Sequence, residues 1–141
     1  DIQAKSRKNF KLVTEIIDSK NSEIFQSERN DDYLLSEVIV QSMLVQIAEN
    51  PFLGKFFEQL TSVDGAEIYF RPIKDYIDIS EPIDFYSLCE SAGFKGETAI
   101  GYQISKKKEL SSLNAGVNIN PNKSEARLYG KKDKIIVFSQ S

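Results

Sequence analysis

The stretch Val63-Asp-Gly-Ala-Glu-Ile-Tyr-Phe-Arg71 marks the point at which the spacing of apolar residues changes. Before it, apolar residues recur at helical spacing. Within it, Ala66, Ile68 and Phe70 begin to alternate with more polar neighbours, and such alternation is typical of a half-buried strand. We therefore expect a helical segment before residue 63 and a strand-rich module after it.

The module after residue 63 should contain three further strands and one helix. Alternation over residues 97–104 and the pair Val117 and Ile119 indicate two strands, and the run Lys134 to Ser139 is apolar on both faces, which predicts a central strand. A short helix should open at Ser80-Glu-Pro82 and end at Gly93. The predicted order is β-α-β-β-β, an α+β arrangement. The basic runs 106–108 and 131–134 fall between strands, where we expect solvated turn charges.

The segment before residue 63 predicts two helices. The first should run from Tyr33 to Glu49, with Asn30, Asp31 or Asp32 as its cap and Asn50-Pro51 as its end, and a second helix should follow Pro51. Apolar residues on the first helix spread wider than one core-facing stripe, so we expect part of it to pair with another subunit. The expected interface residues are Leu35, Val38, Ile39, Met43 and Phe56. The alternative is an αα-hairpin packed on its own domain.

The first apolar run, Lys11 to Ile17, has the β-rich, two-faced character of a strand in a parallel sheet. Only a short polar stretch precedes it, so we expect its neighbours in the sheet to be missing and the sequence to begin inside a domain.

Composition excludes several classes of function. The 141 residues include no histidine and one cysteine, so histidine-based catalysis and an internal disulfide are excluded. The formal charge of −3, with interspersed signs, offers no basic field for nucleic acid, which we do not expect as a partner. No run approaches the roughly 18 apolar residues of a membrane span, so the chain should be soluble. Cys89 shares a helical stripe with Phe85, Leu88 and Ala92, which predicts a buried structural thiol. We assign no catalytic residue and expect no enzyme activity.

Four carboxylates lie close together in the sequence, at Asp75, Asp78, Glu81 and Asp84. Hard cations such as Ca²⁺ take several oxygen ligands from loops of this kind, so these residues are a candidate calcium site. The favoured alternative is that they are solvated or stabilise a helix N-terminus.

Six segments occur in a distinctive order: Asp31-Asp-Tyr-Leu-Leu-Ser-Glu37, Ile47-Ala-Glu-Asn50, Gly65-Ala-Glu-Ile-Tyr69, Gly96-Glu-Thr-Ala-Ile-Gly-Tyr102, Asn120-Pro-Asn-Lys-Ser124 and Lys132-Asp-Lys-Ile-Ile-Val137. In this order they resemble the C-terminal half of castor/pollux-type ion channels, relatives of the RCK and TrkA-type regulators. The resemblance begins near Phe10 and covers nearly the whole chain.

The resemblance implies a layout in three parts. The fold class would be α/β at the start of the chain and α+β at its end. Residues 1–29 would be the C-terminal remnant of a Rossmann-like RCK domain, residues 30–62 a helical crossover and dimerisation arm, and residues 63–141 a TrkA-C-like regulatory subdomain. The Gly-x-Gly-x-x-Gly phosphate loop of many RCK domains is absent from the sequence, so no nucleotide or other cofactor site is assigned.

The implied function is a cytoplasmic module that senses a ligand or ion and gates a cation channel or transporter of the potassium type. Its implied partners are a second copy of the chain, the membrane pore domain of the parent protein and a small ligand or ion. It would lie at the cytoplasmic face of a membrane. The alternative is a fragment of a Rossmann-type nucleotide-dependent enzyme whose catalytic half is missing.

Overall fold

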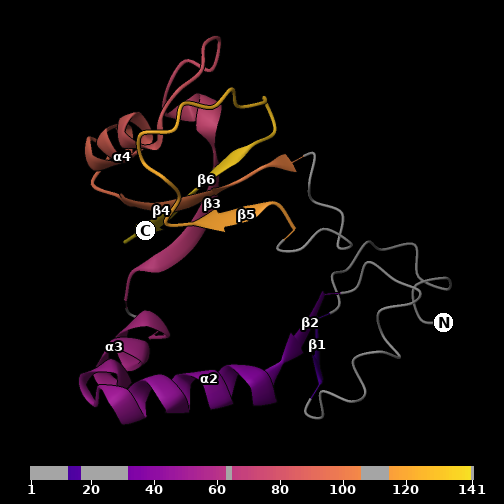
Figure 1. The fold of residues 1–141 in the computed structure, drawn as a ribbon, viewed down its shortest axis with the longest axis vertical. Helices are drawn as coiled ribbons and strands as arrows, with labels where there is room; N and C mark the ends of the chain where they lie inside the picture. Colours follow the sequence, from indigo (N-terminus) through magenta and orange to yellow (C-terminus); the bar gives the residue numbers. More distant parts are fainter. Residues whose placement is uncertain (1–12, 17–31, 63–64, 106–114, 141) are drawn as a thin grey trace, which may run out of the picture. The chain divides into compact units, whose positions relative to one another are not determined.

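The computed structural model describes residues 13–16, 32–62, 65–105 and 115–140. The chain divides into two compact units, Asp1–Phe56 and Phe57–Ser141. Figure 1 shows helices and a parallel strand pair in the first unit, and a four-stranded sheet with α4 in the second.

The strand expected near the start of the chain is present, and it has a partner. Strand β1 (Val13–Ile16) pairs in parallel with β2 (Asp32–Leu35), so that Val13 lies opposite Asp32. The prediction of a strand in a parallel sheet is confirmed. The expectation that its neighbouring strands would be missing is wrong, because β2 is such a neighbour. The run Tyr33-Leu-Leu35 is too short and too uniformly apolar to reveal a period, and the backbone of β1 supplies the hydrogen-bond partners that make it a strand.

Two helices follow directly, α2 (Ser36–Glu49) and α3 (Phe52–Leu60). Helix α2 begins at Ser36 and not at Tyr33, so Leu35 lies in β2 and Asp32, one of the expected caps, lies in a strand. The predicted break at Asn50-Pro51 is confirmed. The side chain of Asn50 accepts a hydrogen bond from the backbone amide of Phe52 at 3.2 Å, which satisfies an amide at the start of α3.

The second unit is built on an antiparallel sheet with the strand order β3-β6-β4-β5. The order along the chain is the predicted β-α-β-β-β, and the predicted central position of Lys134 to Ser139 is confirmed, because β6 pairs with both β3 and β4. A 3₁₀ turn, η3 (Ile73–Asp75), follows the first strand. The four strands are β3 (Glu67–Pro72), β4 (Thr98–Gln103), β5 (Val117–Ile119) and β6 (Lys134–Ser139).

Helix α4 (Phe85–Gly93) covers one face of this sheet (Figure 1). Its apolar residues form a single core with residues of β4, β6 and the loops between them. Side chains alternate between the two faces of the sheet along β6. Ile135 and Val137 therefore point toward this core, and Ile136 and Phe138 point toward the other face. The buried members of the core are Ile73, Ile83, Phe85, Leu88, Ala92, Tyr102, Tyr129, Ile135 and Val137.

The predicted end of α4 at Gly93 is confirmed, but its predicted start at Ser80-Glu-Pro82 is wrong. The helix begins at Phe85, with Asp84 as its N-cap. Before it, Ile83 exchanges two backbone hydrogen bonds with Arg127, at 2.9 and 3.0 Å. This bridge to a residue far along the chain holds the segment extended, so the proline at position 82 precedes the helix instead of lying in its first turn.

Candidate functional site

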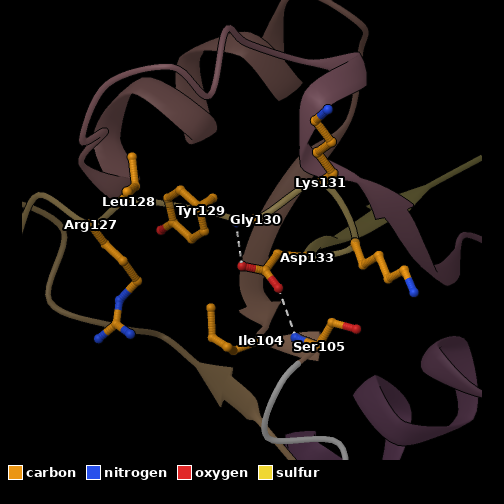
Figure 2. Close-up of a pocket in the computed structure, with 9 residues that line it drawn as sticks. Ile104, Ser105, Arg127, Leu128, Tyr129, Gly130, Lys131 and Asp133 are labelled. Carbon is orange, nitrogen blue, oxygen red and sulfur yellow. Dashed lines mark hydrogen bonds between the residues drawn. The ribbon is translucent and has the colours of Figure 1, made fainter.

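A hollow of about 570 Å³ opens beside the end of β4 and the loop that leads into β6. We call it the Tyr129 hollow. Figure 2 shows Arg127 and Lys131 on opposite sides of it, with Tyr129, Ile104 and Asp133 between them. The lining residues are Ile104, Ser105, Arg127, Leu128, Tyr129, Gly130, Lys131, Lys132 and Asp133.

The carboxylate of Asp133 holds two walls of the Tyr129 hollow together. One oxygen accepts a hydrogen bond from the backbone amide of Ser105 and the other accepts one from the backbone amide of Gly130, both at 2.8 Å (Figure 2). The residue is only 6% exposed. A buried carboxylate with both oxygens bonded to backbone amides fixes the geometry of a loop, so the shape of the hollow depends on Asp133.

The back of the Tyr129 hollow is aromatic. Tyr129 is buried and meets Tyr102 edge to face, with ring centroids 5.5 Å apart, and Tyr102 in turn lies 6.2 Å from Phe85 of α4. The guanidinium of Arg127 lies 5.4 Å from the centroid of the Tyr102 ring. Burial, with a smaller contribution from neighbouring Tyr102, raises the pKa of Tyr129 to about 12. Its phenol is therefore neutral at physiological pH.

A second group of polar residues joins β3, η3 and the start of β4. Arg71 forms an ion pair of 2.7 Å with Glu97, whose side chain is 5% exposed, and the hydroxyl of Tyr76 donates a hydrogen bond of 2.5 Å to the other carboxylate oxygen. Lys95 lies 4.1 Å from the centroid of the Tyr76 ring and donates to the carbonyl of Asp75. Burial, followed by the hydrogen bond to Glu97, raises the pKa of Tyr76 to about 12. The charged and hydroxyl groups of these residues contact one another, so we assign the group a structural role.

The four carboxylates of the candidate calcium site are not brought together as a ligand set. Asp78, Glu81 and Asp84 line a second hollow of about 450 Å³, which we call the Asp78 hollow, but Asp75 does not. Among the residues that the structure describes, no three His, Cys, Asp or Glu side chains group closely enough to hold a metal ion. Calcium binding here stays a prediction.

Two of these carboxylates have local partners. Asp84 accepts hydrogen bonds from both the backbone amide and the hydroxyl of Ser87, at 2.9 and 2.8 Å, and these bonds lower the pKa of Asp84. Asp78 accepts one from the backbone amide of Ser80 at 3.0 Å. The position of Asp84 matches the alternative of the sequence analysis, a carboxylate that stabilises a helix N-terminus.

Three of the five expected interface residues are exposed apolar residues of the first unit. Val38, Ile39 and Phe56 are exposed, whereas Met43 is half-buried; the side chain of Leu35 falls outside the described residues. Within Ser36–Glu49, which the structure describes throughout, no residue is buried. The other exposed large apolar residues of α2 are Val40, Leu44 and Val45.

Cys89 is half-buried and packs against the core of the second unit. Burial raises the pKa of its thiol, which favours the protonated form. The predicted contact with the core is confirmed, but the thiol is half-buried where a buried one was predicted.

The Tyr129 hollow and the Arg71, Glu97 and Tyr76 group were not predicted from the sequence. Their members come from segments far apart along the chain, and the local sequence around Lys131 and Lys132 predicts only solvated turn charges. The other basic run, residues 106–108, lies outside the described residues. The described helices include none with the length and apolar character needed to cross a bilayer.

Comparison with known proteins identifies relatives of one kind. No protein-family model matches the chain. It is 29% identical to the probable ion channel POLLUX of Arabidopsis thaliana, 27% to the probable ion channel POLLUX of Oryza sativa and 26% to the ion channel CASTOR of Lotus japonicus. Each match covers 92% of this chain but only 15%, 13% and 14% of these relatives, respectively. The chain is therefore homologous over nearly its whole length to castor/pollux-type ion channels, of which it corresponds to a small part.

Proposed function

We propose that the chain is a ligand- or ion-sensing regulatory module of a castor/pollux-type cation channel, and that it works through the pairing of subunits. The relatives are named as ion channels and not as enzymes. The observation that carries the proposal is the apolar surface of α2, which the first unit leaves exposed.

The exposed residues of α2 form a surface that favours association. Leu44 and Val45 are the most exposed of them, at 60% and 62%. Val40 lies one turn before Leu44, and Val38 lies two turns before Val45, so the exposed apolar residues cover more than one face of the helix. Exposed apolar surfaces of this kind mark sites where proteins associate. A second copy of the same helix is a self-complementary partner, because a two-fold axis brings the same residues of both subunits together.

Coupling to a gate follows from such pairing by a shift of population. A ligand that binds one arrangement of the paired subunits more tightly than another favours that arrangement, and the shift can reach a pore in the parent protein. We place the ligand in the second unit, where the Tyr129 hollow offers an open site with a fixed loop. In this proposal the parent protein supplies the pore and its potassium-type selectivity. The module lies at the cytoplasmic face of the membrane that the parent spans.

Sedimentation of the 141-residue chain at micromolar concentration tests the pairing. We expect a species of twice the 16.0 kDa mass of the chain. A chain that stays monomeric at this concentration would contradict the proposal.

A further inference from the structure

The Tyr129 hollow is a cationic region in an acidic chain. Arg127, Lys131 and Lys132 line it, against a single carboxylate, that of Asp133, although the whole chain has a formal charge of −3. A cluster of positive side chains attracts a negatively charged ligand, even on a protein whose net charge is negative. The hollow therefore favours an anion.

The carboxylates close to the hollow leave these cations largely without ion pairs among the described residues. Asp133 accepts hydrogen bonds from two backbone amides with its two oxygens. Glu125 lies 3.8 Å from Arg127, but its side chain is 62% exposed, and an exposed pair at this distance is weak. Neither Lys131 nor Lys132 forms an ion pair with another residue that the structure describes. The cationic rim is thus available to a ligand.

The centre of the hollow is apolar. Ile104 and Tyr129 lie there, and Leu128 is 63% exposed at its wall. Figure 2 shows that the charged ends of Arg127 and Lys131 point outward from this centre. A ligand that matches the hollow has an apolar body for the centre and a negative group for the rim.

We propose that the Tyr129 hollow binds a small organic anion, with its apolar part against Ile104 and Tyr129 and its phosphate or carboxylate group at the cationic rim, beside Lys131 and Lys132. This inference rests on the proposed regulatory function, whose ligand it specifies. Asp133 acts as a positioning residue, because it holds the backbone at Ser105 and Gly130 in place.

The test is an NMR titration of the full chain with phenyl phosphate and, in a second arm, with benzoate. The amide signals of Ser105, Tyr129 and Gly130 should shift and saturate at millimolar probe, and the two arms show which anionic group is preferred. Benzyl alcohol, which has the ring without the charge, should bind more weakly, and added salt should weaken both anions.

The double variant Lys131→Gln and Lys132→Gln should bind phenyl phosphate about fourfold more weakly, because each exposed ion pair contributes about a factor of two. Lys74→Gln is the matched control: Lys74 is exposed and lines neither hollow, so its loss should leave binding unchanged. Equal binding of benzyl alcohol, unchanged binding by the double variant, or no saturable shift would each overturn the inference.

Sedimentation of the same samples separates this inference from the proposed function. A dimer that fails to bind either anion would contradict the ligand class alone. A monomer that binds them would contradict the pairing and leave the ligand class standing.

Discussion

Replacing Leu44 by glutamate should weaken the pairing of subunits strongly while leaving the helix intact. Leu44 is 60% exposed in the single chain. Full burial of a leucine side chain contributes about 2 kcal/mol, so burial of its exposed part contributes about 1.2 kcal/mol per subunit. A symmetric pair contains two copies, so the loss is about 2.4 kcal/mol, or roughly fiftyfold in the dissociation constant. The added charges, which repel each other across a two-fold axis, increase this effect.

The dissociation constant is measured by sedimentation equilibrium over a range of concentrations. Gln46→Glu is the control, because it adds the same charge at an exposed polar position of the same helix. Glutamate favours helices, so circular dichroism should show unchanged helical content in both variants. The reasoning is refuted if Leu44→Glu pairs as tightly as the parent chain, or if it loses helix, since Leu44 would then be a core residue.

Four further predictions concern the second unit. Asp84→Ala should lower the free energy of unfolding in urea titrations more than Asp84→Asn does. Hydrogen bonds at the start of α4 lower the pKa of Asp84. The stability that the Asp84 carboxylate contributes should therefore be present above pH 3.8, its ordinary pKa, and be lost as the pH falls through the lowered pKa. Tyr76→Phe should remove one phenol with a pKa of about 12 from an alkaline absorbance titration, and the stability that Tyr76 contributes should be lost between pH 10 and about 12. A chain that starts at Thr61 should give dispersed amide signals, because the buried core lies after that residue; random-coil shifts would contradict this. If the calcium site exists, millimolar calcium should raise the melting temperature more than magnesium does, and Asp78→Asn should abolish the difference; an unchanged melting curve would rule the site out.

The elements predicted correctly are those whose own residues carry the signal. Two apolar faces identified Lys134 to Ser139 as the central strand, and Gly93 identified the end of α4. The two wrong boundaries, at Ser36 and Phe85, share one cause: a distant segment competes for the backbone. Strand β1 pairs with the residues before Ser36, and Arg127 pairs with Ile83 ahead of Phe85. Local spacing holds no information about such partners.

The site was harder to predict for the same reason. The walls of the Tyr129 hollow come from the end of β4 and from a loop more than twenty residues later. The role of Asp133 depends on the backbone amide of Ser105, which carries no sequence signal at all. The basic run Lys131-Lys132 is the only part of the hollow that stands out in the sequence. A run of charges between strands is most often a solvated turn, so it did not predict a site.

The central position of β6 shapes how the sheet can fold. Strands β3 and β4 are not neighbours in the sheet; each pairs with β6, which follows both of them in the sequence. Neither can form its main pairing until residues 134–139 close long loops back to residues 67–72 and 98–103. Contacts of such high sequence separation slow folding and make it cooperative. We therefore expect the core between α4 and the sheet to close only when β6 pairs with β3 and β4.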